Sequence, residues 1–234
     1  MKKGLFAFAM AIGGLLQSCG GGTGVSGDYP VFKTATLTGV KFFLPSSNTE
    51  INSLESDVLR RTTRQVTVLG PDSTGTNCNQ QVNVELCVGA DFSTDRVDVA
   101  FNLEPIKDAK GNPLTTPSPI LIRSYTVSFG NMCVPGTYTY NITYTLTAGE
   151  SKVPIDLVTL DMKQRMAAQG PYTYIHQGVC PNTINNVYRY DGVCSTTARI
   201  EFEAVELATG IVRRITTYLP VRFADFTNEG ECRI

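Results

Sequence analysis

Seven cysteines offer the most reactive chemistry in this chain of 234 residues. A structural zinc site usually needs closely spaced Cys-x-x-Cys pairs, and no two of these cysteines lie that close together. In an exported protein, cysteines instead form disulfides. Cys19 stands alone near the N-terminus, and the even set that follows it predicts three disulfides. The candidates are Cys78, Cys87, Cys133, Cys180, Cys194 and Cys232.

The pairing within this set stays open, because six cysteines allow many combinations and sequence alone does not choose among them. Proximity favours two bridges that close short loops and a third that ties the C-terminus to the domain. Each bridge is expected to stabilise the fold by about 2–4 kcal/mol. The pairs that proximity favours are Cys78–Cys87, Cys180–Cys194 and Cys133–Cys232.

The residues before Cys19 have the pattern of an export signal. Lys2 and Lys3 precede a mostly apolar run at 5–16 that is too short to span a membrane. The run ends in Leu16-Gln17-Ser18-Cys19, which resembles the lipobox of bacterial lipoproteins. That resemblance implies cleavage after residue 18, a diacylglycerol on the Cys19 sulfur and often an acyl chain such as palmitate on its amino group. The alternative is an ordinary secreted protein in which Cys19 remains an odd thiol.

The segment that follows predicts a lipidated, flexible tether at 19–28, because it is rich in glycine. A single domain is expected over 29–234. Several acyl chains would anchor the protein firmly to a membrane. Gly20, in place of Asp, follows the lipidated cysteine, and by resemblance this implies the outer membrane, on either its periplasmic or its outer face. The formal net charge of −1 gives no electrostatic reason to expect nucleic acid as a partner.

Other groups with catalytic potential are sparse. His176 is the only histidine, so a Ser-His-Asp triad or a zinc enzyme would depend on it alone. No Gly-x-Ser-x-Gly elbow accompanies it. The carboxylates at 91, 95 and 98 could approach one another around a turn, but neither they nor those at 201, 203 and 206 have the spacing of a calcium loop. Glu201 and Glu203 share one strand face, where a solvated stripe is the ordinary explanation. We therefore expect no catalytic residue, no metal and no cofactor.

A tyrosine-rich stretch at 170–194 is the best lead to a function. It contains many Asn and Gly residues and little strand pattern, and cysteines flank its second half. A disulfide-pinned loop that exposes tyrosines suits recognition, since tyrosine offers a large contact area at a small entropic cost. The alternative is a loop that packs on its own domain. The residues of this possible recognition loop are Tyr172, Tyr174, Tyr188 and Tyr190.

The remainder of the chain has the composition of strands separated by turns. Val, Thr, Tyr, Phe and Ile alternate with polar residues in runs bounded by Gly, Pro, Asn and Asp. Tyr138, Tyr140 and Tyr144 share one face, where core packing is a commoner use than a stacking platform. Short helices are possible at 52–61 and 161–169. Strands are expected at 36–44, 63–69, 81–88, 96–103, 120–129 (with a bulge), 137–146, 152–160, 197–207 and 211–223.

One region resembles bacterial immunoglobulin-like domains. Strand-like runs at 97–101 and 124–129 flank Lys107-Asp108-Ala109-Lys110-Gly111-Asn112-Pro113-Leu114, which is similar to a turn that often links strands in those domains. The resemblance, together with the strand pattern, predicts an all-β, antiparallel, immunoglobulin-like β-sandwich with at most one or two short helices. Disulfides are expected to brace it.

These observations favour a membrane-anchored envelope or cell-surface lipoprotein that acts as a non-catalytic binding or structural module. Its partners would be the membrane, through the lipid anchor, and a protein or glycan in the envelope or at the surface. Two alternatives remain at this point. One is a hydrolase acting on polysaccharide or peptide, and the other is a carrier of a small ligand or a metal.

Overall fold

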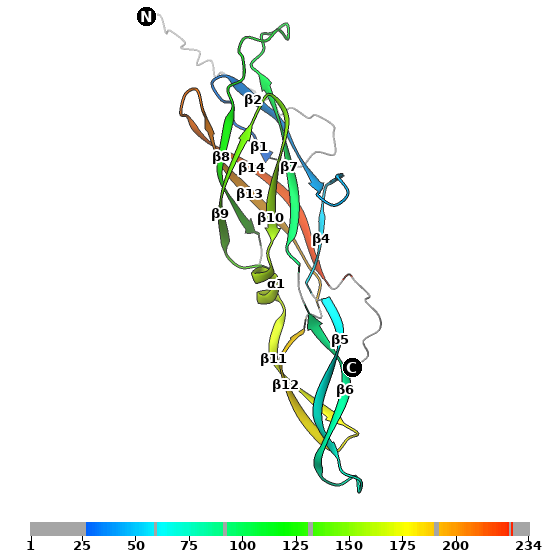
Figure 1. Ribbon diagram of the computed structural model, residues 1–234. Coiled ribbons are helices and arrows are strands. Elements are labelled where there is room, and N and C mark those ends of the chain that lie inside the picture. Colours follow the sequence, from blue (N-terminus) through cyan, green and yellow to red (C-terminus); the bar gives the residue numbers. More distant parts are fainter. Residues whose placement is uncertain are drawn as a thin grey trace, which may run out of the picture.

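The computed structural model describes residues 27–58, 60–90, 93–130, 133–189, 192–224 and 226. Figure 1 shows an elongated molecule with a two-sheet body at one end and an arm of two β-hairpins at the other. The helix α1 (Leu160–Met166) lies where the two parts meet. The prediction of an all-β, disulfide-braced sandwich with a short helix is thus confirmed.

The larger sheet of the body has the strand order β1-β14-β13-β8-β9, and β4 also pairs with β14. All of its pairings are antiparallel except that of β4, which runs parallel to β14. Two short strands therefore cover one edge of β14, and β9 forms the opposite edge of the sheet. The strands are β1 (Gly27–Asp28), β4 (Leu54–Asp57), β8 (Ile120–Phe129), β9 (Thr137–Leu146), β13 (Cys194–Glu206) and β14 (Val212–Ala224).

The second sheet of the body packs against the first and has the order β10-β7-β2-β3, with every pairing antiparallel. The chain passes from one sheet to the other between β9 and β10, so those two strands lie at neighbouring edges. The strands of this sheet are β2 (Ala35–Leu44), β3 (Thr49–Ile51), β7 (Asp95–Pro105) and β10 (Gly149–Val158).

The core of the body follows from the two-residue alternation of these strands. In β7, Val97, Val99 and Phe101 have no exposed surface, and the polar residues between them face outward. Phe202 of the facing sheet meets Phe101 edge-to-face, with ring centroids 5.1 Å apart. Tyr140 stacks on Tyr125 with centroids 4.9 Å apart. Tyr138 and Tyr140, two of the three tyrosines that share one face of this strand, therefore pack against the core.

The arm consists of two hairpins outside both sheets of the body. The first was expected at 63–69 and 81–88, and both strands are longer than those ranges. The second covers 168–189 and so most of the stretch at 170–194, where little strand pattern was recognised, and the prediction of a loop there is wrong. Its residues pair in register from Ala168↔Arg189 to His176↔Cys180. The strands of the arm are β5 (Arg60–Pro71), β6 (Cys78–Ala90), β11 (Ala168–His176) and β12 (Cys180–Arg189).

Two further expectations need correction. The range 52–61 is not helical, because Leu54 and Ser56 alternate inward as β4 and the chain then enters β5. At 161–169 a helix does form, capped by the Thr159 side chain, but it ends at Met166 since β11 begins at Ala168. The last two residues of the predicted flexible tether, Gly27 and Asp28, form the short strand β1 and pair with β14.

The turn that carries the resemblance to immunoglobulin-like domains forms as expected. Asp108 accepts hydrogen bonds from the backbone N–H groups of Lys110 and Asn112, each at 2.8 Å. Gly111 adopts a φ of +85°, a backbone conformation that favours glycine. In the turn between β13 and β14, Gly210 likewise adopts a positive φ, of +69°.

A candidate recognition site at the tip of the arm

Two disulfides are present among the described residues, and they differ from the pairs that proximity favoured. Cys78 is bonded to Cys180, with Cα atoms 5.4 Å apart, and Cys133 is bonded to Cys194, with Cα atoms 5.9 Å apart. Their sequence separations are 102 and 61 residues. The partners are therefore brought together by the fold and not by proximity along the chain: Cys78–Cys180 joins the two hairpins of the arm, and Cys133–Cys194 joins the segment before β9 to the start of β13. The Cys87 side chain and the whole of Cys19 and Cys232 lie outside the described residues.

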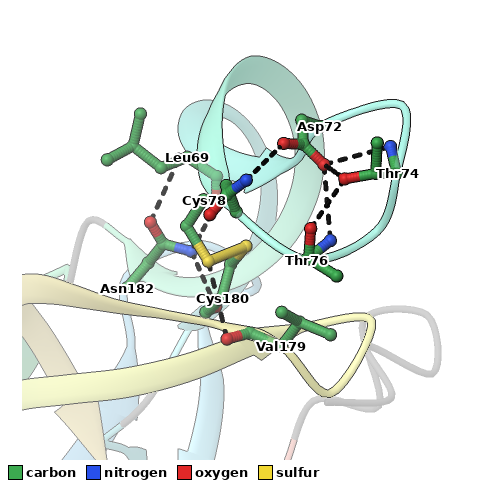
Figure 2. Close-up of a disulfide and its surroundings, with 9 residues drawn as sticks. Leu69, Asp72, Thr74, Thr76, Cys78, Val179, Cys180 and Asn182 are labelled. Atoms are coloured by element: carbon green, nitrogen blue, oxygen red, sulfur yellow. Dashed lines mark hydrogen bonds between the residues drawn. A yellow bond between two sulfur atoms is a disulfide. The ribbon is translucent and has the colours of Figure 1, made fainter.

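The Cys78–Cys180 disulfide clamps the two hairpins of the arm together at their far end. Cys78 begins β6 and Cys180 begins β12, directly after the turns of their hairpins. Figure 2 shows the bond beside the Asp72 turn, with Val179 next to it. The Cys78 sulfur also lies 3.5 Å from the Val179 carbonyl oxygen. We call the two turns and their flanking residues, 69–78 and 175–182, the arm tip.

The amide of Asn182 supplies a second connection between the hairpins (Figure 2). The Leu69 backbone N–H donates to Asn182 Oδ1 at 3.0 Å, and Asn182 Nδ2 donates to the Leu69 carbonyl at 3.0 Å. Nδ2 also donates to the Cys180 carbonyl at 3.0 Å. One side chain thereby occupies both backbone groups of Leu69 as a neighbouring strand would. The hydrogen-bonding groups of Leu69 at this edge of β5 are thereby paired.

A close approach at Gly70 brings the hairpins into contact behind the disulfide. A Cβ atom on Gly70 would lie 2.7 Å from Val82 Cγ2 and 3.1 Å from His176 Cδ2, so glycine is required there. His176 is half-buried at the end of β11, and the Tyr174 hydroxyl lies 3.4 Å from its Nδ1. The only histidine of the chain therefore takes part in packing the arm.

The first turn of the arm tip is organised by Asp72. Its Oδ1 accepts hydrogen bonds from the Thr74 N–H at 3.0 Å and the Thr74 hydroxyl at 2.6 Å. Its Oδ2 accepts one from Asn77 Nδ2 at 2.8 Å. The bonds from Thr74 and Asn77 hold the pKa of Asp72 well below its usual range. The turn is thus built on an ionised carboxylate at any pH at which the protein is normally handled.

Three large apolar side chains remain exposed within the arm tip. Leu69 is 47% exposed, Ile175 58% and Val179 43%. Leu69 belongs to the first segment of the tip and Ile175 and Val179 to the second, and the disulfide and the Asn182 amide hold the two segments together. The tip therefore presents apolar side chains from a fixed framework, as a recognition surface does.

The base of the arm is fixed to the body by a buried ion pair. Lys163 of α1 is 1% exposed, and its Nζ lies 2.9 Å from Asp95 Oδ1 at the start of β7. The Ser56 hydroxyl of β4 donates to the other oxygen of Asp95. Burial raises the pKa of Asp95, although the positive charge of Lys163 opposes that shift. The chain passes between body and arm at each of these residues: Ser56 precedes β5, Asp95 follows β6, and Lys163 precedes β11. Their contacts therefore hold three crossing segments of the chain together.

The Cys133–Cys194 disulfide holds a fourth segment between arm and body, the one that leads from β12 to β13. Cys194 begins β13 just after the chain leaves the arm. On the same side of the body, the Val58 N–H donates to the Ala224 carbonyl at 3.0 Å. Neither this disulfide nor the Lys163 pair was predicted from the sequence. Lys163 stands in a short helix whose residues give no sign that a lysine would be buried.

Tyr172, Tyr174 and Tyr188, three of the four predicted recognition tyrosines, lie along the second hairpin and not on a loop. Tyr174 is half-buried beside His176. Tyr172 and Tyr188 belong to β11 and β12, but their side chains lie outside the described part of the structure, as does all of Tyr190. The alternation of Tyr172, Tyr174 and His176 was the signal that could have indicated a strand there.

Three of the carboxylates singled out in the sequence make contacts within the fold. Asp95 pairs with Lys163, and Glu201 pairs with Arg199 and with Arg214. Glu206 is fully buried and accepts hydrogen bonds from Thr34 and Thr209. Asp91 lies outside the described residues. Over the ranges that the structure describes, no three His, Cys, Asp or Glu side chains come together in the way that a metal ion would need.

Comparison with known proteins does not identify the chain. No protein-family model, no curated protein and no solved structure matches it. Within the described ranges, no helix is long and apolar enough to cross a membrane.

Proposed function

We propose that this protein is an exported, lipid-anchored envelope lipoprotein that binds a protein partner through the arm tip. The observation that carries the proposal is the rigid presentation of Leu69, Ile175 and Val179 by the Cys78–Cys180 clamp. The role is non-catalytic and consists of holding a partner at the outer membrane. The anchor would be Cys19, on the strength of the lipobox resemblance in residues 16–19.

The way the arm is built supports a role in binding. The body has a continuous apolar core of its own, and the arm lies outside it. A disulfide, an amide bridge and a buried ion pair nevertheless hold the arm in place. Such reinforcement lowers the entropic cost of binding, because the contact surface is already ordered before a partner arrives.

The disulfides support an extracytoplasmic location. Structural disulfides persist in oxidising compartments and are rare in the bacterial cytoplasm. Export to the periplasm or the cell surface is therefore consistent both with the signal-like N-terminus and with the Cys78–Cys180 and Cys133–Cys194 bonds.

Two measurements test this proposal. The first is the intact mass of the protein extracted from native membranes, which should show residues 1–18 removed and lipid on Cys19. A soluble, unmodified chain would contradict the anchor. The second is photo-crosslinking in cells from a probe placed at Thr74, an exposed tip residue. It should give one discrete product with a partner protein.

A pair of matched triple variants makes the second test specific. L69S/I175S/V179S should abolish the crosslink from Thr74, because it removes the exposed apolar side chains of the tip. V31S/L114S/L207S removes exposed apolar side chains of the body and should leave the crosslink intact. If both variants reduce the crosslink equally, or if neither does, the tip is not the binding surface.

A further inference from the structure

Strand β9 is the outermost strand of the larger sheet, and its second edge has no partner strand among the residues that the structure describes. In Figure 1 it runs along the side of the body, away from the arm tip. It is 10 residues long and contains no charged residue and no proline. Proteins ordinarily protect such an edge, because its free N–H and C=O groups are a template for another strand.

The other long edges of the body carry such protection. β10, at the edge of the second sheet, contains Pro154 and three charged residues. β14 is covered by β1 and β4, and Pro220 lies between the two covered stretches. At the opposite edge of the second sheet, β3 covers one end of β2, and the remainder includes Lys41. The edge of β9 is therefore exceptional within this molecule.

The sequence of β9 is also nearly the same in both directions. It reads Thr137-Tyr138-Thr139-Tyr140-Asn141-Ile142-Thr143-Tyr144-Thr145, with Thr-Tyr-Thr at each end and Asn141 at the centre. In an antiparallel pair related by a two-fold axis, each residue faces the one at the same distance on the other side of the centre. When two copies of this sequence pair in that way, nearly every residue faces a residue of the same type or of similar character.

We propose that β9 is a self-association edge, which pairs antiparallel with β9 of a second copy of this chain about a two-fold axis at Asn141. The larger sheets of the two copies then join into one continuous sheet. Cross-strand Thr–Thr and aromatic pairs stabilise such a sheet, and no like charges are opposed. The pairs across the axis are Thr137–Thr145, Tyr138–Tyr144, Thr139–Thr143, Tyr140–Ile142 and Asn141–Asn141.

The orientation of the side chains fits this register. Thr139, Asn141 and Thr143 are exposed, and Tyr138 and Tyr140 are half-buried and pack against the core. The even-numbered residues thus lie on the inner face, where Tyr144, which pairs with the fully buried Ile122, keeps 36% of its surface exposed, and the odd-numbered ones lie on the outer face. The alternation continues past the register shift between β8 and β9 to the fully buried Leu146. In the proposed pairing every inward residue faces an inward one, so neither copy has to turn a side chain over.

Disulfide crosslinking of the full mature chain in detergent tests the register. Paired residues of antiparallel strands have Cα atoms about 4.5–5.5 Å apart, within reach of a disulfide. Asn141→Cys should therefore give a covalent dimer under oxidising conditions. Thr137→Cys is the matched control, since its own copy would lie roughly 27 Å away at about 3.4 Å per residue. It should crosslink only when mixed with Thr145→Cys.

Charge variants provide a test that does not involve cysteine. T139K/T143K puts lysines opposite one another and should weaken dimerisation at least tenfold in sedimentation velocity. T139K/T143E puts each lysine opposite a glutamate and should retain the dimer. Both variants change only exposed positions, so equal melting temperatures control for folding. A wild-type chain that stays monomeric at all concentrations, equal behaviour of the two variants, or self-crosslinking of Thr137→Cys would overturn the proposal.

Discussion

The body and the arm are stabilised by different means. In the body, alternating strands bury side chains such as Phe101, Phe202 and Phe223 without any exposed surface. In the arm, only Val68 and Cys180 are buried among the residues whose side chains the structure describes. A small assembly of strands with so few buried side chains needs other connections. Here the disulfide and the Asn182 amide supply them. The comparison suggests that the two parts can be perturbed separately.

The largest loss of stability is expected from Phe202→Ala in the core of the body. Removing a fully buried phenylalanine side chain leaves a cavity and costs about 3–5 kcal/mol. Phe202 also loses its edge-to-face contact with Phe101. Urea denaturation followed by tyrosine fluorescence measures the effect, and Phe202→Leu should cost much less. A loss below about 1 kcal/mol for Phe202→Ala would contradict the view that this core holds the body.

The next largest effect should be confined to the arm. The double variant C78S/C180S removes the clamp and is expected to cost the arm about 2–4 kcal/mol. Hydrogen exchange should then accelerate at amides of β5, β6, β11 and β12, while amides of β13 and β14 keep their protection. Equal acceleration in both parts would show that the arm and the body unfold as one unit.

Lys163→Ala tests the joint between the two parts. It leaves the Asp95 carboxylate without its partner, at an expected cost of about 2–3 kcal/mol, which is below the roughly 3–5 kcal/mol of a fully buried pair because the Asp95 side chain is 18% exposed. The double variant K163M/D95N removes both charges and should recover most of the loss. If the double variant is no more stable than Lys163→Ala, the contribution of Lys163 lies in packing and not in its charge.

A pair of glycine variants compares the packing of the two parts directly. Gly70→Ala in the arm forces a methyl group against Val82 and His176 and should cost about 1–2 kcal/mol. Gly39→Ala in β2 of the body meets nothing within 4 Å and should be neutral or slightly stabilising. Thermal denaturation of both variants provides the measurement. A neutral Gly70→Ala would mean that the hairpins are not closely packed there.

The smallest effect is a pH dependence at the end of the body away from the arm. Burial alone would raise the pKa of Glu206, but hydrogen bonds from Thr209 and Thr34 outweigh it and lower that pKa. The contribution of its charge to stability is thus present above about pH 4 and disappears as the pH falls through the folded-state pKa. Wild type should exceed Glu206→Gln in stability at pH 6, with the gap closing towards pH 3. A constant gap would contradict this.

Strands with strict alternation were predictable from the sequence. The predicted ranges 120–129 and 137–146 coincide with β8 and β9, because turn residues bound each run and one face of each strand is apolar. The bulge in β8 was also expected, and the pairing of β8 with both of its neighbours shifts register there. Local residue patterns suffice where a strand's own faces differ in polarity.

The arm was only partly predictable, for a physical reason. Its hairpins dock through contacts between residues about a hundred positions apart, such as Leu69 with Asn182 and Cys78 with Cys180. Pro171, Pro181 and several Asn residues also weaken the strand pattern of the second hairpin. The lipid on Cys19 and the binding role stay predictions, because they concern covalent modification and a partner.

The Cys78–Cys180 disulfide has a consequence for the maturation of the newly made chain. During synthesis and export, Cys78 emerges long before Cys180, which follows 102 residues later. Cys87 emerges almost at once, only nine residues after Cys78. Early oxidation would therefore favour a non-native bond between Cys78 and Cys87. Correct maturation then requires either delayed oxidation or an isomerase that exchanges the premature bond, and cells that lack such an isomerase should accumulate the mispaired form.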